Sequence, residues 1–237
     1  MSERILLHAG IADSRMYRQQ VETLAPAHAF DLPGFGNGPD EPDVVDYRAF
    51  VRERLPDEPV ALVGTSLGAR IALELALESP ERVAALVLVG SGLDGHEWSQ
   101  EVRAFGDEED AAIERGDLDA AVEANLKLWL PDDVDPGVRR LVAEMQRTAF
   151  ERQIGHEVRE ARLEPPASTR LNDIAVPTLV VTGDEDVRDI HEIADKLAAE
   201  IPGAERATIA GSGHLPSLER PDEFDRVVLA FLGEHGV

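Results

Sequence analysis

The sequence predicts an α/β fold with a mostly or wholly parallel sheet of about six strands, helices on both faces and a helical cap insertion. Short apolar runs alternate with segments of helical periodicity at both ends of the chain. Residues 83–89 are apolar throughout, which is typical of a parallel strand covered on both faces. From residue 93 to 172 strand-like runs vanish and helical patterns follow one another. We therefore expect a core of residues 1–92 and 173–237, interrupted by a cap (lid) of residues 93–172.

Each expected element rests on its local pattern. Apolar runs indicate strands, and apolar residues that recur every three or four positions up to a Pro or Gly indicate helices. The expected strands are residues 4–8, 29–32, 60–64, 83–89, 178–183 and 204–209. The expected helices are residues 16–24, 47–55, 69–78, 98–105, 108–115, 118–130, 137–150, 190–201 and 221–232. Because crossovers between parallel strands are right-handed, the exits of these strands should share one edge of the sheet.

The composition excludes several kinds of site and partner. The chain has 237 residues, 43% of them hydrophobic, and no cysteine, which excludes thiol catalysis and disulfides. Its 47 acidic and 23 basic residues give a formal net charge of −24, which repels nucleic-acid phosphates and anionic lipid surfaces. Neither a signal peptide nor a membrane span is recognisable. We expect a cytoplasmic monomer or homodimer whose partner is a small-molecule substrate, with no nucleic-acid or membrane partner.

Residues 60–72, Val-Ala-Leu-Val-Gly-Thr-Ser-Leu-Gly-Ala-Arg-Ile-Ala, join an apolar strand directly to a helix. Ser66 stands at the centre of Gly-Thr-Ser-Leu-Gly, a pattern that holds its central residue in a strained turn, the nucleophile elbow. The two glycines let strand and helix pass close together, and the serine oxygen is presented at the C-terminal edge of the sheet. Gly-x-Ser-x-Gly also occurs in ordinary loops, but this placement favours a nucleophile.

A serine hydroxyl is a weak nucleophile at neutral pH, so it needs an adjacent base, usually histidine, that is oriented by a carboxylate. Two later strand exits supply candidates. Asp186 follows the fifth expected strand, where Asp184 and Glu185 compete for the same role, and His214 follows the last strand in a glycine-containing loop. The chain order Ser66, Asp186, His214 is the order of a catalytic triad in this kind of sheet. We expect these three side chains to be catalytic.

The oxyanion formed in such a reaction needs two rigid hydrogen-bond donors, an oxyanion hole. The backbone N–H of Leu67, next to the nucleophile at the helix N-terminus, is one candidate. The other candidate follows the small-residue turn after the first strand, where Gly10 is favoured and Ile11 is the alternative.

Taken together, the motifs resemble those of the α/β-hydrolase superfamily, and within it the group of 3-oxoadipate enol-lactonases, small carboxylesterases and cofactor-free haloperoxidases. The matching segments are His8-Ala9-Gly10 with Tyr17, Asp31 to Gly36, Gly64 to Gly68, Gly183 to Asp186, and Gly213-His214 with the run from Glu219 to Phe224. Ala9 replaces the usual glycine of the family, and Tyr17 replaces its Trp. The family's leading antiparallel hairpin has no counterpart here. The resemblance therefore implies a wholly parallel sheet whose strand at 29–32 becomes an edge or is covered by a partner subunit.

The triad and the resemblance imply a serine esterase that cleaves a small carboxylic ester or lactone through an acyl-enzyme at Ser66, with no cofactor and no metal. The same triad serves carbon–carbon bond hydrolysis and cofactor-free perhydrolysis, and a non-catalytic ligand receptor can keep the same fold. The residues expected to line the substrate pocket are Ile11, Tyr17, Trp98, Trp129 and Leu215. Trp98 and Trp129 lie in the cap at helical spacings, so they belong first of all to its packing core.

Overall fold

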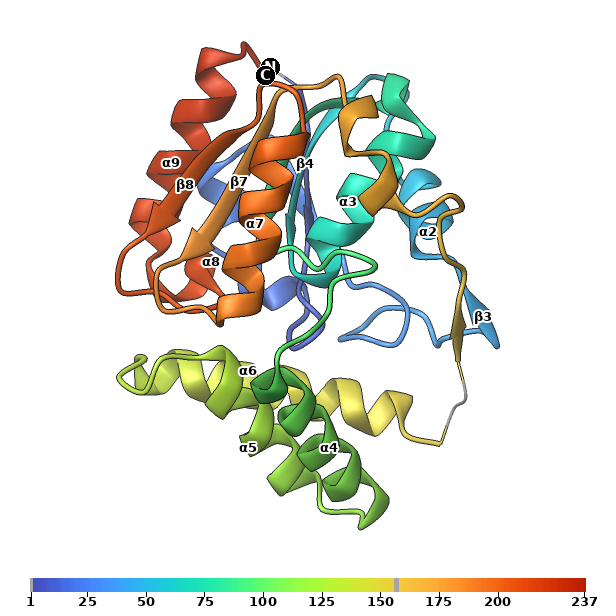
Figure 1. Ribbon diagram of the computed structural model, residues 1–237, viewed down its shortest axis with the longest axis vertical. Coiled ribbons are helices and arrows are strands. Elements are labelled where there is room, and N and C mark those ends of the chain that lie inside the picture. The colour runs from blue at the N-terminus through green and yellow to red at the C-terminus, as the bar shows by residue number, and fades with distance from the viewer. Residues whose placement is uncertain (1, 156–157) are drawn as a thin grey trace.

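A six-stranded parallel sheet forms the centre of the computed structural model, which describes residues 2–155 and 158–237 (Figure 1). Neighbouring strands lie in the order β2-β1-β4-β5-β7-β8, and every pair is parallel. The strands are β1 (Arg4–Leu7), β2 (Ala27–Ala29), β4 (Val60–Thr65), β5 (Val83–Val89), β7 (Thr178–Gly183) and β8 (Glu205–Ile209). The predicted α/β class and parallel sheet are confirmed.

The edge strand β2 is shifted from the expected residues 29–32. It covers Ala27–Ala29 and pairs with β1. The N–H of Leu32 donates to Nε2 of the buried His8 at 3.0 Å, so the chain beyond Ala29 turns towards this side chain and leaves the sheet. Among the described residues no strand covers the outer side of β2, so the edge of the sheet is only three residues long.

Helices pack on both faces of the sheet. The core contains α1 (Gln20–Thr23), α2 (Tyr47–Arg52), α3 (Leu67–Glu78), α7 (Arg188–Glu200), α8 (Pro216–Glu219) and α9 (Pro221–Glu234), with the 3-10 turns η1 (Ser14–Tyr17), η2 (Pro80–Arg82), η3 (Ala167–Thr169) and η4 (Leu171–Asp173). Alternate strand residues point to opposite faces. Leu7 and Leu62 pack with α2, α3 and α7, whereas Leu6 and Val63 pack with η1, α1 and α9. Burial on both faces explains the continuous apolar runs of the strands.

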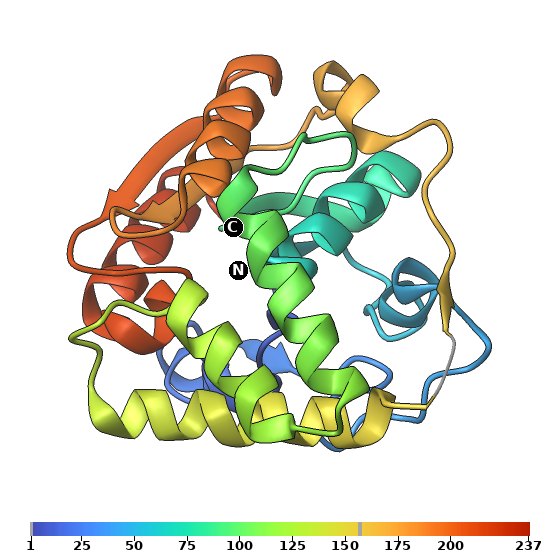
Figure 2. The ribbon, with the colours of Figure 1, turned by 60° about the horizontal axis from the view of Figure 1, so that its bottom comes forward.

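Three helices, α4 (Gln100–Glu114), α5 (Leu118–Trp129) and α6 (Pro136–Gln153), lie across the C-terminal ends of the strands (Figures 1 and 2). The sequence predicted two helices at 98–105 and 108–115, but Gly106 lies inside the single helix α4. That prediction was wrong because a glycine inside a helix costs only about 1 kcal/mol, which the packing of α4 against α5 offsets. Within the described part of the chain, no helix is both long enough and apolar enough to span a membrane.

The cap returns to the core through a second, two-stranded parallel sheet that the sequence did not predict. Its strand β6 (Arg159–Glu160) follows the cap and pairs with β3 (Val44–Val45). Nη2 of Arg70, a residue of α3, donates to Oε1 of Glu160 at 2.6 Å, and Nη1 donates to Oε1 of Glu74 at 2.9 Å. The largely buried pair of Arg70 and Glu160 holds the return strand of the cap on α3, and Glu74 pairs with Arg70 from within α3.

Arg152, near the end of α6, holds the cap to the core at another point. Its guanidinium donates to the carbonyl oxygens of Gly36 at 2.6 Å and Gly38 at 2.8 Å, and it pairs with Asp40 at 2.9 Å. One cap side chain therefore binds the Gly-rich loop that follows β2.

The start of α3 lies unusually close to the end of β1. A Cβ atom added to Gly68 would lie 2.1 Å from the carbonyl oxygen of Leu7, and one added to Gly64 would lie 2.3 Å from the carbonyl oxygen of Gly68. The N–H of Gly68 donates to the carbonyl of His8 at 3.1 Å. A side chain cannot approach a backbone this closely, so both positions require glycine.

We expect Gly68→Ala to lower the free energy of unfolding by about 2 kcal/mol or more, because the added methyl group forces α3 and β1 apart. Chemical denaturation measures this change. The matched control is Gly106→Ala, because nothing lies within 4 Å of a Cβ at that position of α4. The control should stabilise the protein by about 0.5–1 kcal/mol, since alanine is the better helix former. Equal effects of the two substitutions would contradict this account of the elbow.

Candidate active site

Ser66 joins β4 to α3 in a backbone conformation that few residues adopt. Its φ is 54° and its ψ is −110°, and it is the only non-glycine residue with positive φ in the described ranges 2–155 and 158–237. Its N–H donates to the carbonyl of Val89 at 2.8 Å, so a hydrogen bond to the end of β5 holds the strained turn. The side chain makes no capping bond to α3, and the residue is partly exposed. The fold therefore does not use the hydroxyl to cap this helix.

Asp186 and His214 form a buried pair between the loops that follow β7 and β8. Nδ1 of His214 donates to Oδ2 of Asp186 at 2.8 Å, and their side chains are 2% and 1% exposed. The other carboxylate oxygen accepts the N–H of Val187 at 2.8 Å. Because the carboxylate accepts a hydrogen bond from Nδ1–H, Nε2 is the ring nitrogen that is left to take up a proton.

The two competing acids of the same loop have other partners. Oδ1 of Asp184 accepts the backbone N–H groups of Gly211 at 2.7 Å and Ser212 at 3.3 Å, so it holds the histidine loop rather than the ring. Glu185 is exposed, and its backbone N–H donates to the carbonyl of Ser212 at 2.9 Å. Of the three carboxylates that the sequence left open, Asp186 is the one that contacts the imidazole.

The end of β5 brings Ser66 and His214 near each other. The N–H of Ser66 is hydrogen-bonded to the carbonyl of Val89. A Cβ on the next residue, Gly90, would lie 3.0 Å from Cε1 of His214 and 3.4 Å from Oδ2 of Asp186. Gly90 has a φ of 50°, so both its conformation and the space beside it require glycine. In the part of the chain that is described, no hydrogen bond joins the hydroxyl directly to the imidazole. Such bonds are often loose until a substrate is bound.

The sequence did not reveal that Gly90 lies beside the imidazole of His214. The available signal was a glycine placed directly after an apolar parallel strand, at the edge where the triad was expected.

The backbone N–H groups expected to bind an oxyanion belong to neighbouring residues. A Cβ on Gly10 would lie 3.9 Å from Cβ of Leu67. Leu67 is the first residue of α3, where N–H groups have no partner inside the helix and the helix dipole is positive. Among the described backbone hydrogen bonds, neither Gly10 nor Ile11 is a donor. The geometry is compatible with Gly10 and Leu67 as the two donors, and Ile11 stays the alternative.

His8 fixes the turn that carries Gly10. Its ring is fully buried; Nδ1 donates to the carbonyl of Ala9 at 2.8 Å, and Nε2 accepts the N–H of Leu32 at 3.0 Å. Since one ring nitrogen donates and the other accepts, the imidazole is neutral with its proton on Nδ1. Burial lowers the pKa of His8 and keeps it in this form.

Comparison with known proteins places the chain in a family. A sequence model of the alpha/beta hydrolase family matches residues 5–227. The chain belongs to this family. A pimeloyl-[acyl-carrier protein] methyl ester esterase of Nitrosospira multiformis is 30% identical over an alignment that covers 96% of this chain and 93% of that protein. The relationship supports a hydrolase of the esterase type.

Solved structures share the alpha/beta hydrolase fold at lower identity. A thermophilic esterase from Thermogutta terrifontis superposes with a TM-score of 0.80 at 21% identity, over 100% of this chain and 91% of that one. The enol-lactonase from Burkholderia xenovorans LB400 gives a TM-score of 0.79 at 20% identity, over 98% and 91% of the two chains.

Glu219 holds the histidine loop of this alpha/beta hydrolase. Its Oε2 accepts the N–H of Gly213 at 2.6 Å and its Oε1 accepts the N–H of Leu215 at 2.7 Å, so one carboxylate binds both neighbours of His214. The residue is 8% exposed, and burial raises its pKa. The sequence matched Glu219 to a family motif but did not reveal this role.

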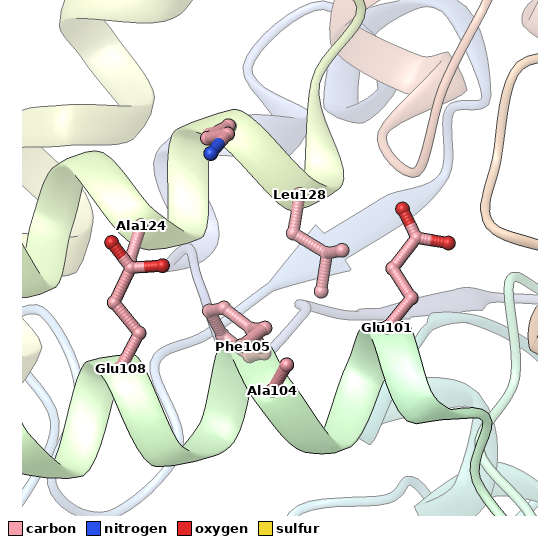
Figure 3. Close-up of a pocket in the computed structure, with 7 residues that line it drawn as sticks. Glu101, Ala104, Phe105, Glu108, Ala124 and Leu128 are labelled. Carbon is pink, nitrogen blue, oxygen red and sulfur yellow. The ribbon is translucent and has the colours of Figure 1, made fainter.

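A pocket of about 240 Å³ lies between α4 and α5 in the cap of the hydrolase (Figure 3). Phe105 and Leu128 contribute apolar surface, and Glu101 and Glu108 stand at its two ends. The ring of Phe105 packs edge-on against Trp129, with 6.0 Å between centroids. The catalytic candidates do not line this pocket.

The residues expected to line a substrate pocket differ in their accessibility. Ile11, Tyr17 and Leu215 are almost completely buried. The hydroxyl of Tyr17 shares a 2.6 Å hydrogen bond with Oγ1 of Thr65, so this side chain supports the residue before Ser66 and presents no open surface to a ligand. Trp98 and Trp129 are partly exposed, and Trp129 lies against the ring of His214. Contact with a substrate stays a prediction for these residues.

We expect acid to destabilise the hydrolase through His8. Its pKa is lowered in the folded state, so below about pH 6.5 the unfolded chain binds a proton that the folded chain excludes. This contribution to stability is complete above pH 6.5 and is lost as the pH falls towards the folded-state pKa. As the pH falls, the free energy of unfolding should therefore decrease more steeply in wild type than in His8→Gln. The difference between the two slopes should be up to about 1.4 kcal/mol per pH unit. Denaturation between pH 5 and 7.5 measures both slopes, and parallel curves would contradict the assignment.

Proposed function

We propose that this protein is a serine hydrolase that cleaves a small carboxylic ester or lactone through an acyl-enzyme at Ser66. The proposal rests on the buried pair of His214 and Asp186, which packs against Gly90. The residue before Gly90 is Val89, whose carbonyl accepts a hydrogen bond from the N–H of Ser66. A serine on a strained turn, next to a histidine oriented by a carboxylate, is the arrangement that activates a hydroxyl group. The similarity to a methyl ester esterase supports the same class of reaction.

In the proposed reaction, Oγ of Ser66 attacks the carbonyl carbon while Nε2 of His214 takes its proton. Asp186 keeps the proton on Nδ1 and stabilises the imidazolium that results. The imidazolium then gives its proton to the leaving alcohol as the carbon–oxygen bond breaks, which leaves the acyl group on Ser66. A water molecule, deprotonated by His214, then attacks the carbonyl carbon of this acyl-enzyme. As the bond from that carbon to Oγ breaks, His214 returns the proton to Oγ, which releases the acid and regenerates the hydroxyl of Ser66.

The oxyanion of each tetrahedral intermediate is bound by the N–H groups of Leu67 and Gly10. These donors are fixed before the reaction by the helix start and by the turn that His8 holds, so little energy is lost in orienting them. Loss of one such donor typically lowers the rate by about 10²–10³.

The charge of the protein supports a neutral or apolar substrate. The formal net charge is −24, from 47 acidic and 23 basic residues. A field of this sign disfavours polyanionic substrates such as acyl-CoA thioesters. We therefore propose a small ester or lactone that is not attached to an anionic carrier.

Turnover and active-site labelling test the function directly. We expect the wild type to hydrolyse p-nitrophenyl acetate or butyrate, or members of a panel of simple lactones, and to react with a fluorophosphonate probe at Ser66. Ser66→Ala should lose the labelling and about 10⁵-fold or more of kcat, because it lacks the nucleophile. Steady-state kinetics and mass spectrometry of the labelled peptide provide the measurements.

Other outcomes point to other functions. A folded protein that shows neither turnover nor labelling would exclude the enzyme and favour a ligand receptor. Labelling at Ser66 with turnover only of a carbon–carbon bond, or only of peracid formation from hydrogen peroxide, would keep the triad and replace the substrate class.

Asp186→Asn should lower kcat by about 10³–10⁴, because an amide does not hold the proton on Nδ1 of His214. Glu185→Gln is the matched control: it neutralises an exposed acid of the same loop, and we expect kcat within twofold of wild type. The two variants are compared with the best ester of the panel. Similar losses in both would argue against Asp186 as the residue that orients the imidazole.

A further inference from the structure

We propose that Trp129, at the end of cap helix α5, is a positioning residue for His214. Its indole and the end of its helix hold the imidazole in place and favour the positive charge that the ring acquires during proton transfer. This inference rests on the proposed serine hydrolase function, in which His214 becomes an imidazolium when Ser66 attacks.

The backbone of the cap is hydrogen-bonded to the histidine loop. The N–H of His214 donates to the carbonyl of Trp129 at 3.1 Å. Trp129 is the last residue of α5, and the last carbonyls of a helix have no partner inside it, so His214 satisfies one of them. The contact is close: a Cβ on Gly213 would lie 3.0 Å from this carbonyl oxygen and 2.8 Å from Cδ of Pro131.

The side chain of Trp129 lies over the imidazole. The two ring centroids are 4.3 Å apart and the ring planes are inclined by 36°. Phe105 of α4, which lines the cap pocket of Figure 3, packs edge-on against the indole. The indole is thus held between the cap helices and the imidazole, and His214 is only 2% exposed.

Both contacts favour a cation at this position. The face of an aromatic ring attracts positive charge, and that of tryptophan does so most strongly. The C-terminal end of a helix carries a partial negative charge that also favours a nearby cation. The neutral imidazole of the resting enzyme gains less from either contact. The benefit therefore appears in the transition state, and it should change kcat rather than substrate binding.

The test compares Trp129→Leu, Trp129→Phe and Phe150→Leu on p-nitrophenyl acetate. Trp129→Leu removes the aromatic face but keeps the backbone contact, so we expect kcat to fall about tenfold with KM within twofold of wild type. Trp129→Phe keeps a smaller aromatic face and should retain kcat within about threefold. Phe150→Leu removes a different buried ring of the cap, on α6, and should leave kcat within twofold.

The changes in kcat across the three variants distinguish a positioning role of the indole from a general disruption of the cap. A fall in kcat that is specific to Trp129→Leu and largely restored by Phe supports the inference. Wild-type kcat in Trp129→Leu overturns it, and so do equal losses in all three variants. Thermal unfolding shows whether each variant is folded, and Trp129→Met takes the place of the leucine variant where that one is not. A wild type without turnover or labelling at Ser66 overturns the proposed function, and this inference with it.

Discussion

The close contact between the start of α3 and the end of β1 is the constraint on which the rest of the site depends. With Gly68 against the carbonyl of Leu7, the elbow and the turn after β1 cannot move independently. The contact places Gly10 beside Leu67, while the N–H of Ser66 is bonded to the end of β5. Three adjacent strands thereby fix the position of the candidate nucleophile and of both candidate oxyanion donors. The strained backbone of Ser66 persists because these contacts determine it from several sides.

Buried side chains hold the loops of the site by accepting their backbone N–H groups. His8 accepts from Leu32, and Glu219 accepts from both neighbours of His214. Asp186 uses one oxygen for the imidazole and the other for the N–H of Val187, the residue before α7. Each of these side chains is more than 90% buried, and the loss of any one would leave a buried donor without a partner at a cost of about 1–3 kcal/mol. The strands therefore fix the nucleophile and the oxyanion donors, and side chains that bind backbone fix the loops that carry the histidine and its carboxylate.

The sequence predicted the fold where burial on both faces of the sheet leaves a clear pattern. The strands at 83–89 and 178–183 were predicted with their observed bounds, since the first is apolar throughout and the second has the apolar centre Leu-Val-Val between two threonines. The edge strand was misplaced because its end is set by a tertiary hydrogen bond to His8, which no local pattern reports. The pair of β3 and β6 was missed because strands of two residues have no measurable periodicity.

In the candidate site, too, the sequence predicted what a local pattern reports and missed what tertiary contacts decide. Ser66, the acidic loop and His214 were predicted from strand exits and chain order, but three neighbouring acids in one loop look alike in sequence. Only the direction of each side chain separates Asp186, which contacts the ring, from Asp184, which contacts backbone. The roles of Gly90 and Trp129 could not be predicted from the sequence, because both depend on contacts with His214, which is distant in the chain. Gly90 leaves space for the imidazole, and Trp129 reaches the imidazole only through the arrangement of the cap helices.

These contacts also limit how the cap can move. Three contacts join the cap to the core. The end of α5 is hydrogen-bonded to His214, Arg152 of α6 is hydrogen-bonded to the loop after β2, and Glu160 of the return strand forms an ion pair with Arg70. A rigid rotation of the whole cap away from the sheet would break all three contacts and would withdraw the indole from the imidazole. A substrate can therefore enter without loss of these contacts only if the movement is smaller than a rotation of the whole cap. In such an arrangement the cap is a fixed wall of the site as well as its cover.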